Sequence, residues 1–334
     1  MKKLIIVLVV STIAAFSPAT DGEGGGKKAL KVLMIGNSFS VCVLRQAPEI
    51  AKDLGCDLKL CSMYIGGCSL ERHAKNLAAS EADAKARQYS VSSNYGLCGR
   101  LGIPETLQKE KWDIVTIQQA SHFSAFADTY DPWADQLIAG IRKYAPQAEI
   151  RVQQTWSYSK LDGRVWGAGG KGRWKHGERE FRWNQSDMYA NLTTNYVNLA
   201  RKNGFKIIPT GKAVQLFRER RPVMFVPNWP VLGKCKTEAD IPKNDDPVGN
   251  VSFKHPWNNE IKKIDTTRPK RISTDSIHLS PSGEYLQGLV WVGEIFDVDP
   301  IACKYKPAFV SEEDARLFRE CAKDALAAAK TGNL

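Results

Sequence analysis

The chain has 334 residues, of which 43% are hydrophobic and 25% are charged, with 26 glycines, 16 prolines and 8 cysteines. This composition is that of a globular protein with a sizeable core, and it excludes a disordered tail, a collagen-like rod and a small disulfide-stapled module. The formal net charge of +11 at pH 7 is compatible with an anionic polysaccharide, a nucleic acid or a membrane surface as partner and selects none of them.

The N-terminus has the pattern of a secretory signal peptide. Lys2 and Lys3 precede an apolar stretch that ends in small residues at and before Ala19. The stretch is too short for a transmembrane helix, which needs ~20 apolar residues. We therefore expect residues 1–19 to be a signal peptide and residues 20–28 a flexible lead-in. The mature protein is then exported to the periplasm or the medium, without stable membrane insertion. An uncleaved membrane anchor is the alternative.

Short apolar runs with strand composition alternate along the rest of the chain with segments of helical periodicity. Pro48 lies inside one helical segment, so that helix either bends there or begins there. Strands separated by helices predict a parallel sheet with helices on both faces. The predicted strands lie at 29–35, 57–64, 113–117, 149–155 and 205–209, and the predicted helices at 43–54, 103–110, 131–144, 186–203, 281–296 and 312–329.

This alternation predicts one α/β domain over residues 29–334. We expect a three-layer α/β/α sandwich around a parallel five-stranded sheet. Residues 160–182 are rich in Gly, Trp and basic side chains, and residues 222–271 are long, polar and rich in Pro, Asn and Asp. Loops of this length in a compact domain are usually functional or disordered, so we interpret both stretches as insertions.

All eight cysteines lie beyond the expected signal peptide, and no two of them form a C-x-x-C pair. Their spacing matches no zinc pattern, and His176 and His255 have no carboxylates at ligand spacing, so we expect no metal site. Export favours some disulfides, although their pairing does not follow from the sequence.

Ser38 directly follows the first predicted strand, where the ligand site of a parallel α/β sheet is normally found. A serine at such a turn is a candidate nucleophile, and the amides of the next helix can stabilise negative charge beside it. The alternative is that Ser38 or Ser40 only caps that helix. A serine nucleophile needs a base, and the base needs an acceptor that orients it. Asp275 and His278, three residues apart before a predicted helix, have the residue types for those two roles.

Donors for an oxyanion hole follow the second and third predicted strands. Gly67 comes after the second strand, and Gln118, Gln119 and His122 come after the third. Neighbouring parallel strands would bring these residues close to Ser38, and an oxyanion hole uses backbone and side-chain N–H donors. The alternatives are a tight turn for the glycine and hydrogen bonding at the strand end for the glutamines.

Taken together, four segments resemble, in chain order, the motifs of the SGNH/GDSL hydrolase superfamily. They are GNSFS (36–40), YIGGCSLERH (64–73), WDIVTIQQAS (112–121) and DSIHLSPSG (275–283). In their residues, these segments resemble an uncharacterised branch of the superfamily that is found in exported bacterial proteins. The resemblance implies an SGNH-hydrolase fold of flavodoxin-like type, with Ser38 as nucleophile, His278 as general base and Asp275 as the acid that orients it. Gly67 and the amide of Ser38 would donate to the oxyanion.

Two departures from the family pattern matter. Asn37 stands where the family usually has Asp, which is a minor change because that residue is not the proton acceptor. The third motif normally supplies an Asn within G-x-N-D, and alignment of the strand ends places His122 at that position. We expect Gln118 or Gln119 to supply the side-chain amide instead, because an amide donates at every pH whereas His122 needs the right tautomer or a proton.

Two further residues could line a substrate pocket. His73 lies shortly after Gly67, and Trp156 follows the fourth predicted strand. Trp156 belongs to an aromatic group around the first insertion that either stacks on sugar rings or buries the insertion against the domain. The group comprises Trp156, Tyr158, Trp166, Trp174, Phe181 and Trp183.

These patterns predict an exported serine esterase that needs no metal or organic cofactor. Export, basic charge and the aromatic insertion favour O-acyl groups, such as acetyl, on carbohydrate as the substrate. A catalytically silent glycan-binding protein on the same fold is the main alternative, and a lipase or thioesterase is another. No motif for nucleic-acid binding is present, and the oligomeric state stays open.

Overall fold

The computed structural model describes residues 29–159, 165–166, 181–182, 185–221, 235–241, 245–258, 260 and 263–334. The expected signal peptide and lead-in, and most of the first insertion, lie outside these residues. No helix within the described ranges is both long enough and apolar enough to cross a membrane.

The centre of the molecule is one sheet of seven strands, β1 (Ala29–Gly36), β2 (Asp57–Tyr64), β3 (Tyr89–Ser93), β4 (Gly99–Leu101), β5 (Ile114–Ile117), β6 (Glu149–Gln153) and β9 (Lys206–Ile208). Their order across the sheet is β4-β3-β2-β1-β5-β6-β9. The five strands from β2 to β9 are parallel, whereas β3 and β4 are antiparallel to their neighbours. The expected mixed α/β fold with a mostly parallel sheet is confirmed. The expected count of five strands is wrong, because β3 and β4 extend one edge.

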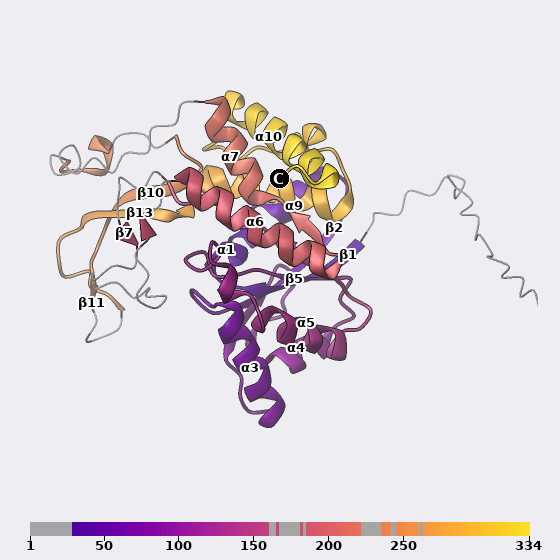
Figure 1. Ribbon diagram of the computed structural model, residues 1–334. Coiled ribbons are helices and arrows are strands. Elements are labelled where there is room, and N and C mark those ends of the chain that lie inside the picture. The colour runs from indigo at the N-terminus through magenta and orange to yellow at the C-terminus, as the bar shows by residue number, and fades with distance from the viewer. Residues whose placement is uncertain are drawn as a thin grey trace, which may run out of the picture.

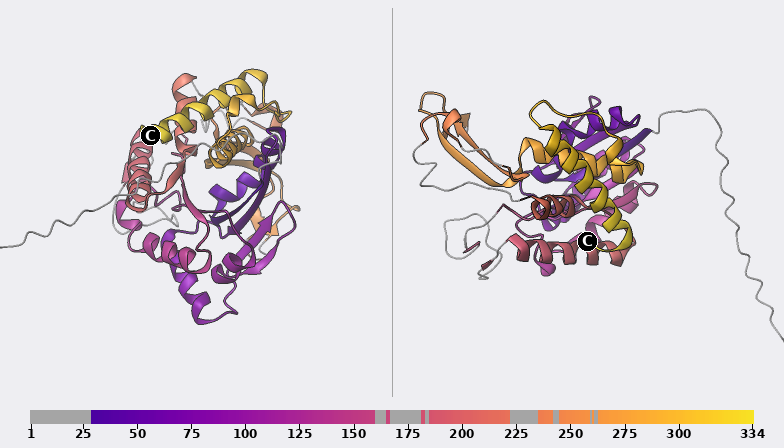
Figure 2. Two further views of the ribbon diagram at one scale, coloured as in Figure 1. Left: turned by 90° about the vertical axis from the view of Figure 1, so that its right-hand side faces the viewer. Right: turned by 90° about the horizontal axis from the view of Figure 1, so that it is seen from above.

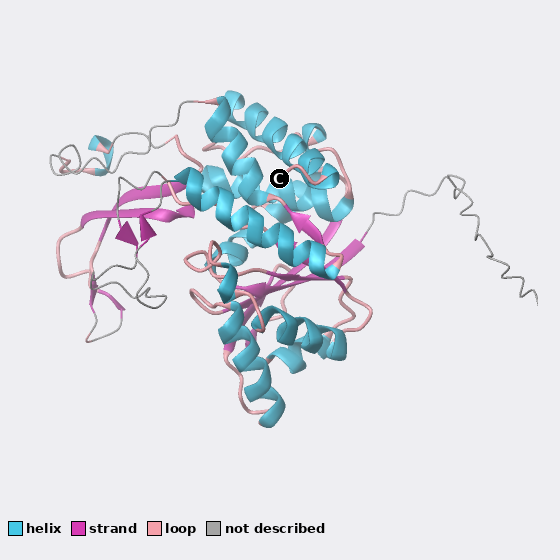
Figure 3. Cartoon of the chain, viewed as in Figure 1, coloured by secondary structure: helices cyan, strands magenta, loops and turns pink. Residues whose placement is uncertain are grey.

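Helices cover both faces of this sheet (Figures 1 and 3). The α-helices are α1 (Ser38–Val41), α2 (Ala47–Asp53), α3 (Leu70–Ala82), α4 (Ile103–Lys109), α5 (Trp133–Tyr144), α6 (Gln185–Asn203), α7 (Thr210–Arg220), α9 (Pro281–Phe296) and α10 (Glu312–Thr331). Helices α2, α7, α9 and α10 pack together, and α3, α4 and α5 form a second group. The four residues from Val32 to Ile35 on β1 are at most 1% exposed, as expected for a central strand covered on both faces.

The predicted helix over 43–54 is divided in two. A 3-10 helix, η1 (Cys42–Arg45), comes first, and α2 begins at Ala47 with Pro48 in its first turn. Proline is tolerated there because the first amides of a helix have no partner inside the helix. The remaining 3-10 helices are η2 (Ala127–Thr129), η3 (Glu238–Asp240) and η4 (Pro300–Ala302).

An antiparallel hairpin joins β10 (Val248–Lys254) of the second insertion to β13 (Arg271–Leu279), which begins where the insertion ends. Figures 1 and 2 show this hairpin extending away from the sandwich. Asp275 and His278 both lie on β13, which no strand prediction covered and which is followed after Ser280 by α9. Four two-residue strands complete the list, β7 (Val165–Trp166), β8 (Phe181–Arg182), β11 (Trp257–Asn258) and β12 (Lys263–Ile264).

The cysteines do not behave as the export argument suggested. Cys42, Cys61, Cys68, Cys303 and Cys321 are buried free thiols. Burial raises the pKa of Cys61 and Cys68 to about 12, so both stay protonated and act as small apolar core residues. The expectation of disulfides is therefore not met at these five positions.

Candidate active site

Ser38 is the first residue of α1, immediately beyond the carboxyl end of the central strand β1. Asn37, not a serine, caps this helix, because its side-chain Oδ1 accepts a hydrogen bond from the Phe39 amide at 3.0 Å. Ser40 donates its hydroxyl to the Asn37 carbonyl at 3.1 Å. The capping interpretation is therefore wrong for Ser38, whose hydroxyl is left to interact elsewhere.

The hydroxyl of Ser38 instead meets the base that the sequence suggested. Ser38 Oγ lies 2.8 Å from His278 Nε2, and His278 Nδ1 lies 2.7 Å from Asp275 Oδ2. With an ionised carboxylate as neighbour, Nδ1 carries the proton, so Nε2 can accept from the serine. The side chain of His278 is 44% exposed. A substrate can therefore approach the serine–histidine pair from solvent.

The environment of Asp275 keeps it ionised. Burial alone would raise its pKa, but the hydrogen bond from His278 and the backbone amides of His278 and Ile277 lower it to about 2. Those amides donate to Asp275 Oδ1 at 3.0 and 2.9 Å, while Oδ2 faces the imidazole. One carboxylate oxygen thus fixes the local backbone and the other orients the histidine ring.

Two buried polar side chains support the arrangement of Ser38, His278 and Asp275, and the sequence did not reveal them. Gln153 at the end of β6 and Gln287 on α9 both donate to the Phe39 carbonyl, at 2.7 and 2.9 Å. They hold the backbone directly after Ser38. The position of Gln153 at the carboxyl end of a strand beside β5 was a signal that could have found it, because the carboxyl ends of parallel strands share one edge.

Gly67 and the two glutamines differ in how they can serve an oxyanion hole. Gly67 has φ +60 in the turn after β2, a left-handed conformation that glycine adopts without strain. Gln119 cannot act as donor, because its amide nitrogen already donates to both the carbonyl and the hydroxyl of Thr129, at 2.8 and 3.1 Å. Gln118 faces the nucleophile turn and donates to Asn37 Oδ1 at 2.8 Å. Its second amide hydrogen and its Oε1 have no partner among the described residues, but the side chain is only 1% exposed, so it can contact an oxyanion only from below the Ser38 turn.

His122 is the competing donor. Burial lowers its pKa to about 4, so it is neutral at physiological pH. A neutral imidazole donates through only one of its two nitrogens. The candidates for the side-chain donor are therefore Gln118, which is 1% exposed, and His122, which is half-buried.

Two residues expected to line a pocket are instead fully buried. His73 is 0% exposed on α3, its Nδ1 lies 2.8 Å from the Tyr89 hydroxyl, and burial lowers its pKa to about 3. Trp156 is also 0% exposed and stacks on Phe39 with ring centroids 4.1 Å apart. Neither side chain can touch a substrate in this structure, so both assignments to substrate binding are corrected.

The other aromatic residues in and around the first insertion divide between the core and regions that the structure does not describe. Tyr158 is buried, and its hydroxyl is hydrogen-bonded to Ser121 at 2.9 Å. Trp174 and Trp183 lie outside the described residues, and for Trp166 and Phe181 only the backbone pairing of β7 with β8 is described. Within the described ranges, no group of three His, Cys, Asp or Glu side chains could hold a metal ion.

Comparison with protein families identifies the domain. The family model described as "Domain of unknown function (DUF4886)" matches residues 31–220, more than half of the chain. The chain belongs to the DUF4886 family. The matched range includes Ser38, Gly67 and Gln118 of this DUF4886 protein and ends before Asp275 and His278. No curated protein matches this chain.

Solved structures support the fold of this DUF4886 chain. A DUF4886 family protein from Bacteroides uniformis ATCC 8492 is 23% identical, with 92% of this chain and 97% of that chain covered and a TM-score of 0.66. A protein described as a candidate SGNH hydrolase from Slackia heliotrinireducens is 18% identical over 80% of this chain and 100% of its own, with a TM-score of 0.43. A candidate GDSL-like lipase from Parabacteroides merdae ATCC 43184 is 11% identical over 79% and 94%, with a TM-score of 0.39. The neighbours thus include proteins of the superfamily that the motifs resemble, although only the first is similar enough to support an argument, and that argument concerns the fold.

Proposed function

We propose that this DUF4886 protein is an exported serine esterase that removes O-acyl groups, such as acetyl, from carbohydrate. The observation that carries the proposal is the continuous hydrogen-bonded chain from Ser38 Oγ through His278 to Asp275, at 2.8 and 2.7 Å. A nucleophile within reach of a base that a third group orients is the general signature of nucleophilic catalysis.

The proposed mechanism follows from this geometry. His278 Nε2 takes the proton of Ser38 as Oγ attacks the ester carbonyl, and Asp275 stabilises the imidazolium that forms. The tetrahedral oxyanion is stabilised by the amides of Ser38 and Gly67 and by one side-chain donor. The imidazolium then protonates the leaving alcohol, and water, deprotonated by His278, hydrolyses the acyl-enzyme and regenerates Ser38.

Carbohydrate is proposed as the alcohol component of the ester for chemical reasons. The exported state expected from the N-terminal pattern and the basic net charge of +11 are compatible with an extracellular polysaccharide. His278 is 44% exposed and Ser38 partly exposed, which suits access by a bulky polymer. A lipase would instead be expected to surround its site with apolar surface, and the exposed large hydrophobic side chains of the described residues are Ile264, Ile301 and Phe309.

Two measurements test the proposal on the purified mature protein. The first is turnover of a chromogenic acetyl ester by the wild type, by Ser38→Ala and by Ser90→Ala, a control in which an exposed serine on β3 loses its hydroxyl. The second is labelling with a fluorophosphonate, which reacts with an activated serine whatever the natural acyl group. We expect turnover and labelling in the wild type and the control, and neither in Ser38→Ala.

The two readouts separate the alternatives. Labelling of Ser38 without acetyl turnover would support a serine hydrolase and would show that its substrate does not carry an acetyl group. A wild-type protein that neither turns over the ester nor labels would reject the enzyme and favour a silent glycan-binding protein.

A further inference from the structure

The hairpin that delivers the triad base carries an unusual concentration of positive charge. Between residues 248 and 274 the sequence has two carboxylates, Glu260 and Asp265, against six cations, which are Lys254, Lys262, Lys263, Arg268, Lys270 and Arg271. Asp265 is already engaged by the backbone amide and hydroxyl of Thr267. The hydrogen bonds and Arg268 lower the pKa of Asp265, so its carboxylate is ionised, and even with Glu260 counted the segment keeps four more positive than negative charges.

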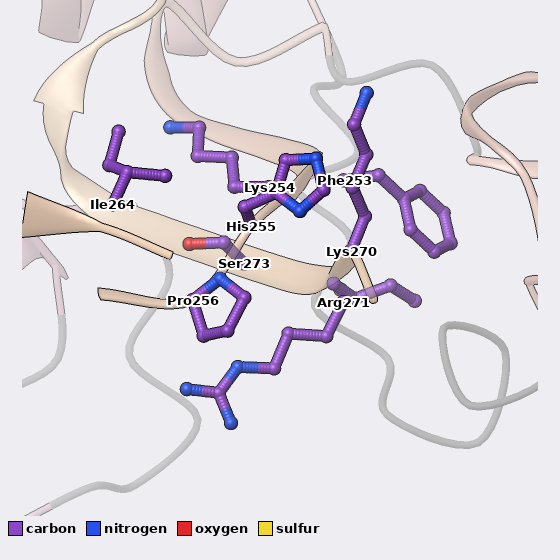
Figure 4. A pocket seen from close by; sticks show the side chains of 9 residues that line it. Phe253, Lys254, His255, Pro256, Ile264, Lys270, Arg271 and Ser273 are labelled. Atoms are coloured by element: carbon purple, nitrogen blue, oxygen red, sulfur yellow. The ribbon is translucent and has the colours of Figure 1, made fainter. Parts of the chain in front are cut away.

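A cavity of about 660 Å³ lies on this part of the hairpin. Figure 4 shows its lining side chains, which come from both strands and from β12. Lys254, Lys270 and Arg271 supply charge, and none of them forms an ion pair with a residue that the structure describes. Phe253, Pro256, Ile264 and Ile272 supply apolar surface to the same cavity.

The strand register places two of these positive charges opposite each other, which destabilises the hairpin when no anion is bound. Lys254 pairs directly with Arg271 across the two strands. Like charges at directly opposed positions of an antiparallel pair destabilise it. A bound anion would relieve that repulsion, and the apolar surface could contact the C–H face of a ring that carries the anion.

The same register places Arg271 of this cavity on the same face of the hairpin as Asp275. Arg271 and Asp275 are four residues apart on β13, with unbroken pairing between them. Side chains alternate along a strand, so these two project from the same face, separated by about 13 Å at ~3.3 Å per residue. A chain molecule bound along this face could occupy the cavity and the nucleophile at once.

We propose that this cavity is a subsite for the acidic sugar units of the substrate, so that the protein acts on an anionic, O-acylated polysaccharide. The inference rests on the proposed esterase function for its catalytic meaning, whereas the anion binding can be measured without turnover. A membrane surface fits the hairpin less well, because Ile264 is the only large hydrophobic side chain that its described residues expose.

The test uses oligogalacturonate, a carboxylated oligosaccharide without ester groups, titrated calorimetrically into the full mature protein. The cavity variant is Lys270→Gln/Arg271→Gln. The matched control is Lys85→Gln/Arg100→Gln, which removes the same charge from two exposed residues, one before β3 and one on β4. We expect the wild type and control to bind equally, with an affinity that falls as salt is added, and the cavity variant to bind about tenfold more weakly.

Equal affinities of the cavity variant and the control would overturn the proposal. So would cavity-dependent binding of phosphatidylglycerol vesicles or of a neutral xylo-oligosaccharide without binding of oligogalacturonate. For the catalytic part, the ratio of kcat/KM on acetylated polygalacturonate to kcat/KM on a neutral acetyl ester should fall about tenfold in the cavity variant relative to the control.

Failure of the two proposals can be told apart. If Ser38 does not label but oligogalacturonate binding depends on the cavity, the esterase is rejected and the anionic site is supported. If the enzyme is active and the kcat/KM ratio does not change in the cavity variant, the subsite is rejected and the esterase stands.

Discussion

Trp156 and Ile277 are 121 residues apart in the chain and are joined by a hydrogen bond of 2.9 Å from the indole Nε1 to the peptide carbonyl. Ile277 lies between the two triad residues of β13, and the neighbouring Ser276 carbonyl accepts from both the amide and the hydroxyl of Ser159 at 3.1 Å. The segment after β6 therefore ties down the base of a hairpin that otherwise extends from the sandwich. The geometry of His278 depends on this attachment.

Replacing Trp156 by Phe should show this positioning role. Trp156→Phe keeps a ring that can stack on Phe39 but leaves the half-buried Ile277 carbonyl without its donor, so we expect kcat to fall about tenfold with little change in KM. Trp112→Phe is the matched control, because Trp112 is equally buried and its Nε1 donates to the Thr106 carbonyl at 3.0 Å. Steady-state kinetics and thermal unfolding of both variants check the prediction. Equal losses of kcat in both would mean a general effect on the fold.

The triad should behave as one unit. Ser38→Ala, His278→Ala and the double variant should each lose nearly all ester turnover, and their losses should not add, because the proton transfer needs both groups. Asp275→Asn should be no worse than these, since Asn can keep the acceptor for the Ile277 and His278 amides while losing the charge beside Nδ1. Rates from all four variants provide the check, and wild-type activity in Ser38→Ala would refute the assignment of the nucleophile.

Glu284 should make stability depend on pH. It lies on α9, paired with Arg45, and burial raises its pKa to about 7 although Arg45 acts to lower it. A carboxyl whose pKa is higher in the folded state stabilises the fold while protonated, and this contribution is lost as pH rises from its unfolded value of 4.5 through about 7. The free energy of unfolding of the wild type should therefore fall, relative to Glu284→Gln, between about pH 5 and about pH 8.

Urea unfolding at the two pH values measures this effect. Glu312→Gln serves as control, because the side chain of Glu312 is 84% exposed. The control should follow the wild type at both pH values. A wild-type protein whose difference from Glu284→Gln stays constant with pH would show that Glu284 titrates normally.

Three variants should identify the side-chain oxyanion donor. Gln118→Ala should lower turnover by ~10²–10³, the usual cost of losing one oxyanion donor, whereas His122→Ala should cost much less. Gln119→Ala removes the bonds to Thr129 and the acceptor of the Leu70 amide, so it should lower the unfolding temperature more than the rate. Kinetics on variants shown to be folded decide the matter. A large loss in His122→Ala alone would transfer the role to the histidine.

The N-terminal pattern predicts a processed chain. Protein recovered from the periplasm or medium should begin between Ser17 and Gly26, because a charged start, an apolar stretch and small residues direct cleavage there. Mass spectrometry of the intact protein measures the terminus. Recovery of a chain that starts at Met1 from the cytosol would contradict the prediction.

The sequence by itself determined the elements whose signals are local. The apolar run before Gly36 predicts β1, and Ser311 and Asp314 predict the start of α10, where the Asp314 amide donates to Ser311 Oγ at 3.0 Å. Such signals depend on periodicity and on caps a few residues long, so they can be read without knowledge of the fold. The position of Ser38 between β1 and the next helix is predicted by local signals of the same kind.

Only the tertiary structure decided which distant side chains meet. Ser38 and His278 are 240 residues apart, and their contact depends on how an entire insertion folds back, which no local pattern records. Gln118 and Gln119 are neighbours of the same type, yet one faces Asn37 and the other Thr129, because side chains at a strand end point to opposite faces. Trp156 is buried against Phe39 rather than exposed to sugar for a similar reason. Aromatic composition is the same in a core and in a binding surface, and only packing distinguishes them.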